Sequence, residues 1–337
     1  MTRFTRLLAA ATLALTAVAC GGGGGTPADQ LAEPGRTRVT LTLNWVPYGE
    51  HAPFYYGLKK GIFARAGIDL VIRPGSGSGN TIQQVAQRKT DFGWADTPPL
   101  LKGVAAGMKI KSVGVYLQKG PSAIEFFADK HIRSPADLRG KSVGGTPGDT
   151  LYATFPAWLK ANGVDQADVR VVSVDPAGKI SALATGEVDA IMGFFHDQAP
   201  TIENRTGRKV SYLLFTDWGM NLLGTGLVAH DEMLADNPDL VRRFVRATQQ
   251  AWTEAAKDIP GAADAMAELA TDEPPKQVLV EQLTLAVSLL ATGRADTPGV
   301  DSEAKWTETI GLMAEHGGLR APGPAKRYWD PSYAAGS

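Results

Sequence analysis

The chain has 337 residues, 44% of them hydrophobic, which is enough for about two globular domains with cores of their own. Its 34 basic and 35 acidic residues nearly cancel, so the sequence offers no broad positive surface for nucleic acid. A single cysteine excludes an internal disulfide and a metal site built on paired thiolates.

The N-terminus has the pattern of an export signal. Arg3 and Arg6 precede the uncharged run 7–18, which is too short to span a bilayer and has the length of a signal-peptide core. The run leads to Cys20 and a stretch of glycines, a junction that resembles a bacterial lipoprotein processing site. Ala17 departs from the leucine that such sites usually have three positions before the cysteine.

From this junction we expect residues 1–19 to be a signal peptide and Cys20 to be the lipidated first residue of the mature chain. Residues 20–36 would then be a flexible linker, and the body would be extracytoplasmic and anchored to the membrane through the lipid. Ordinary secretion with cleavage nearby is the alternative.

Alternating patterns predict strands from residue 38 onward. In 38–44 the side chains of Leu41 and Leu43 fall on one face, which is the two-residue period of a strand. Helical patterns, such as 54–64 and 81–89, separate many of the strands and indicate α/β layers with largely parallel sheets. Further strands are predicted at 68–73, 91–95, 109–117, 123–128, 143–145, 169–174, 188–192 and 210–215.

The C-terminal third predicts mostly helices. Asn237 as the N-cap and Pro238 as the first helical residue introduce apolar residues at helical spacing. The stretches 277–290 and 304–316 continue this pattern. Pro156 interrupts an earlier helical run, so we expect a bend there or a helix that starts later.

Several stretches of the body carry a family pattern. Residues 44–51 read N-W-V-P-Y-G-E-H directly after the first strand, and 91–96 and 184–190 supply further matches in the same order. Together they resemble the solute-binding proteins of bacterial ABC importers, over residues 38–260. The W-x-P-x-x-x-H spacing is similar to the branch for thiamine-precursor pyrimidines, whose relatives include nitrate, sulfonate, taurine and riboflavin receptors. Tyr48 stands where pyrimidine receptors commonly have asparagine, which leaves the ligand open.

The resemblance implies an α/β fold of two lobes around a hinged cleft, the type II arrangement of periplasmic binding proteins. Residues 37–118 and 225–337 would form one lobe and 119–224 the other, with the chain crossing between them near 116–127 and near 214–225. The resemblance also implies a monomer whose lobes close on a small-molecule ligand and deliver it to an ABC permease in the membrane.

Ligands of open α/β sheets bind beyond the carboxyl ends of the strands. Aromatic faces can hold a planar heterocycle there, so Trp45 and Tyr48 are candidates for stacking, and Asp96 for accepting from an exocyclic amine. Packing beside the hinge is the alternative for each ring. His51 has two interpretations, a ligand contact or a structural hydrogen bond within its loop. The candidates at these two strand ends are Asn44, Trp45, Tyr48, His51, Trp94, Asp96 and Thr97.

A Gly/Ser turn at 75–79 leads into the predicted helix 81–89. Such a turn can present backbone N–H groups to an anion, although a plain flexible turn is the alternative. The turn places three more residues in the predicted site, Ser76, Ser78 and Asn80. A similar turn at 144–150, in the second lobe, adds Thr146 and Asp149.

The stretch 193–197 follows another apolar run and offers Phe195 and His196 as ligand-binding candidates. Because side chains alternate along an extended segment, one of Phe194 and Phe195 packs inward and the other faces the cleft, and the sequence leaves open which. Asp217, near the second crossing, is a further candidate with hinge packing as its alternative.

The sequence predicts no catalytic residue, no metal site and no cofactor. The histidines form no H-x-H or H-x-x-x-H pair. The G-x-S-x-G match at 140–144 is followed by a strand, whereas a nucleophile elbow requires a helix. Enzymes of the same extended family that make the thiamine pyrimidine carry a cysteine-rich motif, and this chain has no cysteine after Cys20.

These patterns predict an extracytoplasmic solute-binding lipoprotein that captures a small aromatic heterocycle, such as a thiamine-precursor pyrimidine, for an ABC importer. One alternative is a receptor for riboflavin or for a small anion such as an alkyl sulfonate, taurine or nitrate. Another is an extracytoplasmic enzyme. Aromatic residues at strand ends favour the heterocycle, because anion sites favour arginine and abundant N–H donors.

Overall fold

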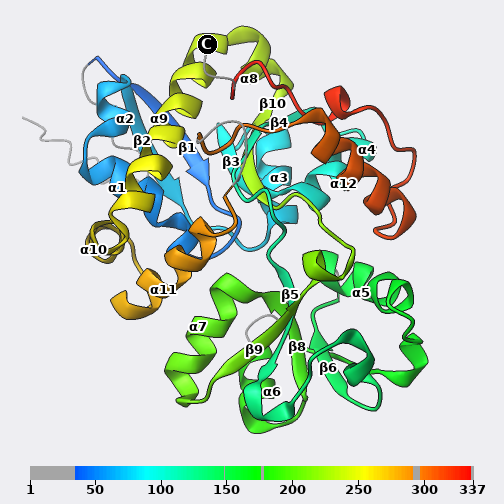
Figure 1. Cartoon of the computed structure of the whole chain (residues 1–337). Helices are drawn as coiled ribbons and strands as arrows, with labels where there is room; N and C mark the ends of the chain where they lie inside the picture. Colours follow the sequence, from blue (N-terminus) through cyan, green and yellow to red (C-terminus); the bar gives the residue numbers. More distant parts are fainter. Residues whose placement is uncertain (1–34, 148, 176–177, 291–296, 335–337) are drawn as a thin grey trace, which may run out of the picture. The chain divides into compact units, whose positions relative to one another are not determined.

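The strands of this protein form two five-stranded sheets, shown in Figure 1. The computed structural model describes residues 35–147, 149–175, 178–290 and 297–334, so the predicted signal peptide, Cys20 and most of the linker lie outside the described residues. The strand order is β2-β1-β3-β10-β4 in the first sheet and β7-β6-β8-β5-β9 in the second. We call the part built on the first sheet lobe 1 and the part built on the second sheet lobe 2. Both lobes belong to one compact unit, Glu33–Ser337.

The strands largely follow the sequence patterns. Lobe 1 contains β1 (Thr37–Thr42), β2 (Ile68–Arg73), β3 (Phe92–Asp96), β4 (Ile110–Val115) and β10 (Thr225–His230). Lobe 2 contains β5 (Ser122–Phe127), β6 (Ser142–Gly145), β7 (Arg170–Ser173), β8 (Ala190–Phe194) and β9 (Val210–Leu214). The patterns did not predict β10, because all of its residues are buried and it shows no alternation.

The expectation of largely parallel sheets needs one correction in each lobe. β10 runs antiparallel to β3 and β4, and β5 runs antiparallel to β8 and β9, while the pairs β1–β2, β1–β3, β6–β7 and β6–β8 are parallel. Both reversed strands are the first that the chain forms after it crosses into a lobe. The crossing thus sets the direction of the strand that follows it.

Helices cover the sheets of both lobes. The first lobe holds α1 (Ala52–Lys59), α2 (Ile62–Arg65), α3 (Ser78–Ala86) and α4 (Thr97–Ala105), with a short 3₁₀ turn η1 (Gly49–His51) before α1. Between β5 and β9 come α5 (Thr150–Ala161), α6 (Lys179–Thr185) and α7 (Phe195–Thr206). After β10 follow α8 (Asp231–Asp236), α9 (Pro238–Lys257), α10 (Ile259–Leu269), α11 (Lys276–Val287) and α12 (Glu303–Glu315). The expected later start of the helix at Pro156 is not observed, because α5 runs through this residue.

Large aromatic side chains fill the core of each lobe. Pro238 opens α9 as predicted, and the helix presents a buried apolar face to the sheet. On this face Trp252 stacks on Trp94 with 5.6 Å between ring centroids. In lobe 2, Trp158 stacks on Phe215 at 4.5 Å. Trp94 lies on β3, whose last residue is Asp96, and Phe215 begins the second segment that connects the lobes.

Two short segments connect the lobes and pair with each other. The first crossing, 116–121, joins β4 to β5, and the second, 215–224, joins β9 to β10. Gly224 N–H donates to the carbonyl of Leu117 at 2.8 Å, and a Cβ on Gly224 would come within 2.9 Å of that same oxygen. Thr97 holds the second crossing in place, since its backbone N–H and its hydroxyl both donate to the Gly224 carbonyl.

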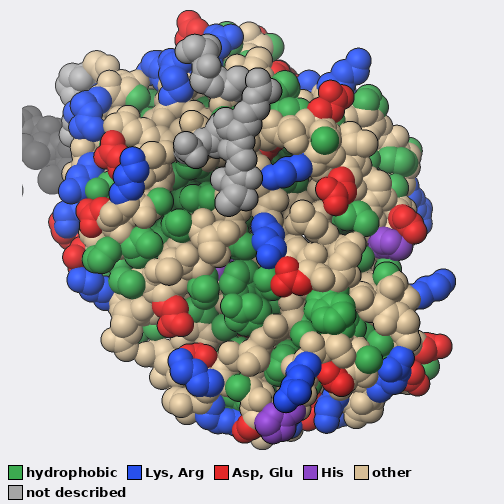
Figure 2. All heavy atoms as spheres, viewed as in Figure 1, with side chains coloured by type: hydrophobic (Ala, Val, Ile, Leu, Met, Phe, Trp, Pro, Cys, Tyr) green, Lys and Arg blue, Asp and Glu red, His purple; other side chains and the backbone are tan. Residues whose placement is uncertain are grey.

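On the face seen in Figure 2, acidic and basic side chains are interspersed, in line with the balanced composition. No helix among the described residues is long and apolar enough to cross a membrane.

Candidate functional site

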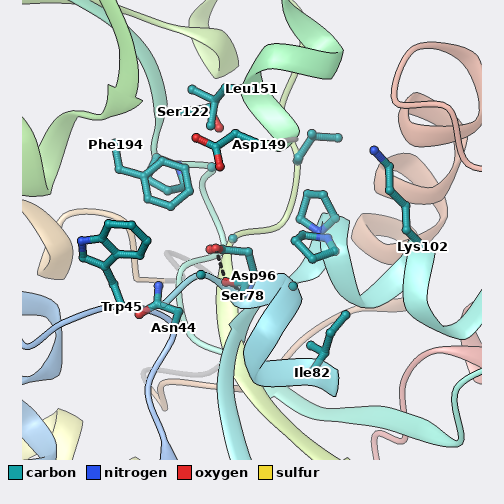
Figure 3. A pocket seen from close by; sticks show the side chains of 18 of the residues that line it. Asn44, Trp45, Ser78, Ile82, Asp96, Lys102, Ser122, Asp149, Leu151 and Phe194 are labelled. Carbon is teal, nitrogen blue, oxygen red and sulfur yellow. Dashed lines mark hydrogen bonds between the residues drawn. The ribbon is translucent and has the colours of Figure 1, made fainter. Parts of the chain in front are cut away.

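A cavity of about 460 Å³ lies between the lobes (Figure 3). Its walls are the loop after β1, the first turns of α3 and α4, the end of β8 with the start of α7, and both crossings. The carboxyl ends of β1, β3 and β8 therefore meet at this cavity, as expected for open α/β sheets.

Two aromatic rings face this cavity from different lobes. Trp45 follows β1 in lobe 1, and Phe194 is the last residue of β8 in lobe 2; both are half-buried. In Figure 3 the two rings lie on the same side of the cavity with open space between them. Phe195, by contrast, is 3% exposed and packs against Tyr212. Of the two adjacent phenylalanines, Phe194 therefore faces the cavity and Phe195 packs inward.

Asp96 provides an acidic group near the middle of the cavity. It ends β3, and its carboxylate accepts hydrogen bonds from the hydroxyls of Ser78 at 2.6 Å and Thr225 at 2.9 Å. Burial raises the pKa of Asp96 to about 6; the bond from Ser78 opposes this shift and the charge of Glu50 adds to it. At neutral pH this side chain is an acceptor for an N–H donor on a ligand.

Asn44 and His51 form a fixed pair beside Trp45. The Nδ1 atom of His51 accepts from the backbone N–H of Tyr48 at 3.3 Å, so its Nε2–H donates to the side-chain oxygen of Asn44 at 2.7 Å. Burial lowers the pKa of His51 to about 4, which keeps the ring neutral. Because the Asn44 oxygen is taken, the group that Asn44 offers is its amide NH₂, and Figure 3 shows this side chain pointing into the cavity.

A buried carboxylate, Glu50, joins the two lobes behind this pair. It is 0% exposed and accepts from the Tyr48 hydroxyl, from Trp94 Nε1 and from His196 Nε2, each at 2.6 Å. Burial alone raises the pKa of Glu50, but the hydrogen bond and charge of His196 outweigh it, and the pKa lies below its ordinary value. Glu50 lies on η1 of lobe 1 and His196 on α7 of lobe 2, so the pair is a contact between lobes.

The lobe 2 side of the cavity is polar and carries several charges. Lys179 Nζ donates to the Met192 carbonyl at 3.2 Å and lies 3.7 Å from the carboxylate of Asp149. Burial raises the pKa of Asp197 to about 6, against the opposing charges of His196 and Lys179.

Behind this wall, Gly193 lets two buried oxygens approach the strand. A Cβ on Gly193 would stand 2.0 Å from Gln198 Oε1 and 2.4 Å from Glu125 Oε1. Neither of these oxygens has a hydrogen-bond donor among the described residues. Burial raises the pKa of Glu125 to about 8, so its carboxyl group is protonated at neutral pH and has a proton to donate.

The structure brings some of the sequence-predicted residues together at the cavity. These are Asn44, Trp45, Tyr48, Ser78, Asp96 and Asp149. Tyr48 contributes little surface, because it is 3% exposed and its hydroxyl is bonded to Glu50. The ring opposite Trp45 is therefore Phe194 rather than Tyr48.

Other predicted residues are buried away from the cavity. Trp94 lies in the core of lobe 1, because β3 is a central strand buried on both faces. His51 and His196 are both 0% exposed and occupied by Asn44 and Glu50. Phe195 packs against Tyr212 of lobe 2 and belongs to a buried core cluster whose members come mostly from lobe 1. For His51, the structure thus favours the structural hydrogen bond over the ligand contact.

The remaining predicted residues bond elsewhere. The hydroxyls of Thr97 and Thr146 donate to backbone carbonyls, and Asp217 forms an exposed ion pair with a lysine at 3.1 Å. Asn80 donates to Ser76 at 2.6 Å on the exposed side of the turn.

Two backbone N–H groups of the Gly/Ser turn are also engaged. The N–H groups of Gly75 and Gly77 donate to the carbonyls of Trp45 and Asn44, at 3.0 and 2.7 Å, and are not free for an anion.

Sequence reasoning missed Glu50, Phe194, Lys179, Asp197 and Lys102. Glu50 lies inside the 44–51 motif, and Phe194 was left open beside Phe195, so both had a local signal. Lys179 and Lys102 lie on helices without a distinctive pattern, and only the fold places them at the cavity. Among the described residues, no group of histidine, cysteine, aspartate and glutamate side chains is arranged to hold a metal ion.

Solved structures share this fold. The alkanesulfonate-binding protein SsuA of Xanthomonas axonopodis, bound to MOPS, superimposes with a TM-score of 0.65 at 17% identity, over 89% of this chain and 99% of that one. The nitrate-binding protein NrtA of Synechocystis gives 0.64 at 13% identity, over 88% and 87%. The fold is thus the two-lobe α/β fold of periplasmic binding proteins, as the resemblance implied.

Curated relatives cover most of the chain. The riboflavin-binding protein RibY of Chloroflexus aurantiacus is 29% identical over 304 residues, 86% of this chain and 84% of that protein. The formylaminopyrimidine-binding protein of Halalkalibacterium halodurans is 22% identical over 292 residues, 84% and 87%. A relative in Legionella pneumophila named 4-amino-5-hydroxymethyl-2-methylpyrimidine phosphate synthase is 25% identical over 224 residues, 64% and 68%.

The family model described as NMT1/THI5 like matches residues 49–263. This match spans more than half of the 337 residues and includes the end of the loop that carries Glu50, all of β3 and the whole of lobe 2. The chain belongs to the NMT1/THI5-like family.

Proposed function

We propose that this protein is the solute-binding component of an ABC importer and that it captures a flat nitrogen heterocycle in the cavity between its lobes. The observation that carries the proposal is the placement of Trp45 and Phe194, one ring from each lobe, on the same cavity. A planar ligand stacked between them contacts both lobes at once, so its binding energy favours the closed arrangement. Thiamine-precursor pyrimidines and riboflavin both supply such a ring, and relatives named for each kind of ligand support them as candidates.

Polar groups beside the two rings can form hydrogen bonds with the edge of such a heterocycle. The Asn44 amide offers donors for a ring nitrogen or carbonyl, while the Asp96 carboxylate accepts from an amine or ring N–H. Both groups are held by neighbours of the same lobe, so little conformational freedom is lost on binding. An aminopyrimidine and the pyrimidine edge of a flavin each present this combination of donor and acceptor.

A small anion such as a sulfonate or nitrate fits this part of the cavity less well. The carboxylates of Asp96, Asp149 and Asp197 face the cavity. The backbone N–H groups of Gly75 and Gly77 are already bonded to carbonyls. A free inorganic or alkyl anion would meet like charge beside Asp96, and the lysines that line the cavity, Lys102 and Lys179, lie on other walls of it.

Location and anchoring belong to the same proposal. Export by residues 1–19 and lipidation of Cys20 would hold the protein at the outer side of the membrane, where a permease receives the ligand. A Cys20→Ser variant expressed in a bacterial host should move from the membrane fraction to the soluble extracytoplasmic fraction. Retention of the variant in the membrane fraction would contradict lipidation at this residue.

The ligand proposal is tested by titrating the purified body with riboflavin and with aminopyrimidines. Riboflavin fluorescence should be quenched on binding, because its ring stacks on an indole. Trp45→Ala should weaken binding of any heterocycle by about tenfold or more, from lost stacking and lost apolar contact. Tyr212→Ala serves as the matched control, since this exposed aromatic residue lies outside the cavity. Unchanged affinity in a folded Trp45→Ala protein would overturn the proposal.

A further inference from the structure

The cavity is larger than a single heterocycle requires. An apolar cavity of about 150 Å³ holds a benzene molecule, whereas this one measures about 460 Å³. Trp45 lies at one side of the cavity and Lys102 at the other, with Asp96 and Ser78 between them (Figure 3). A single ring stacked on Trp45 therefore leaves the Lys102 side empty.

The Lys102 side of the cavity is mostly apolar. Its wall combines Ile82 of α3, Pro98 and Pro99 of α4, Met108 just after α4, and Leu222 and Leu223 of the second crossing, and the polar side chain beside them is that of Gln83. The α3 and α4 walls are packed closely, since a Cβ on Gly103 would come within 2.9 Å of both Ile82 and Met108. Such a surface favours a hydrocarbon or ring substituent over a hydrated polar one.

Among the described residues, Lys102 has no counter-charge. No carboxylate among the described residues lies within ion-pair distance of its Nζ. The three carboxylates of the cavity have other partners: Asp149 lies near Lys179, Asp96 binds two hydroxyls, and Asp197 accepts from Gln282. Partial burial lowers the pKa of Lys102.

We propose that the ligand has two parts, a flat heterocycle between Trp45 and Phe194 and a substituent that runs along the apolar wall and ends in an anion paired with Lys102. The proposal rests on the function inferred above and narrows its ligand class to heterocycles with an anionic tail, a phosphate or a carboxylate. An anion there supplies the counter-charge that no described residue provides, and apolar surroundings strengthen the pairing.

Matched pairs of ligands test this inference directly. For phosphate, riboflavin 5′-phosphate is compared with riboflavin, and thiamine monophosphate with thiamine. For carboxylate, a flavin with a carboxyalkyl chain on N10 is compared with its alkyl counterpart. The anionic member of at least one pair should bind about tenfold tighter to the wild-type protein in calorimetric titration, and this ratio should shrink as salt is added. The pair that shows the preference identifies the anion.

The variant Lys102→Met keeps the length and apolar stem of the side chain but removes its charge. It should bring the affinity ratio of that pair to about one, while Lys119→Met, on a lysine outside this cavity that pairs with Asp217, should leave the ratio unchanged. Equal binding of both members in every pair, or a preference that survives in Lys102→Met, overturns the two-part ligand but leaves heterocycle binding standing. Failure of all the ligands to bind overturns the proposed function and this inference with it.

Discussion

Glu50 Oε2 and His196 Nε2 lie 2.6 Å apart, both side chains are 0% exposed, and they belong to different lobes. The same oxygen accepts from Tyr48, whose ring borders the cavity. A single carboxylate therefore links the wall of the cavity to the contact between the lobes.

Removing this charge should destabilise the protein. Glu50→Gln puts an amide NH₂ against donors that now bond to a carboxylate, and breaking a buried pair typically costs about 3–5 kcal/mol. We expect a loss of this order in the free energy of unfolding, measured by urea denaturation. Asp217→Asn, which breaks an exposed pair with Lys119, should cost less than about 1 kcal/mol. Equal losses in both variants would mean that Glu50 is not a structural link.

The two adjacent phenylalanines should behave differently. Phe194→Ala removes a ring that faces the cavity, so it should weaken heterocycle binding about tenfold with a small effect on stability. Phe195→Ala removes a buried ring and should cost about 3–5 kcal/mol of folding free energy. Titration and denaturation of both variants separate the roles, and a larger binding defect in a folded Phe195→Ala protein would reverse the assignment.

Glu125 should make stability fall as pH rises. Its folded pKa, about 8, is above the unfolded value near 4.3, so its contribution is fully present below about pH 4 and is lost as pH rises through 8. Glu125→Gln replaces the titrating carboxyl group with an amide that is neutral at every pH. Between pH 5 and pH 8.5 the wild type should therefore lose about 4 kcal/mol of unfolding free energy that this variant keeps. A difference between the two proteins that stays constant with pH would contradict a protonated Glu125.

Gly193 should tolerate no side chain. In Gly193→Ala the new methyl group would overlap Gln198 and Glu125, so both side chains must shift, and Gln198 lines the cavity. We expect a loss of about 1–3 kcal/mol in stability together with weaker ligand binding. Gly311→Ala is the control, because this glycine lies in α12 with open space around it and alanine should stabilise the helix by about 0.5–1 kcal/mol.

The sequence was most informative where a local pattern reports the environment of a residue. Alternation in 38–44 led to β1, and the loop that follows it, with Asn44 and Trp45, lines the cavity. β10 was missed because a strand buried on both faces has no alternation. Trp94 was misplaced for a related reason: the aromatic residue nearest the end of a central strand still lies in the core.

Local sequence patterns could not identify contacts between residues that lie far apart in the chain. His196 and Glu50 are separated by 146 positions, and nothing near either residue indicates the other. Lys179 and Lys102 reach the cavity only because the lobes fold toward each other. Local sequence thus identified most of the strand ends, while the charges that surround the ligand depend on how those ends converge.

The paired segments 116–121 and 215–224 form part of the cavity wall. Pro121, Leu222 and Gly224 line the cavity and also belong to the two segments that connect the lobes. A ligand that contacts these residues therefore contacts the connecting segments directly. The depth at which a ligand binds should therefore affect the angle between the two lobes of the bound protein. A permease that recognises this angle would then distinguish ligands by how deeply they bind.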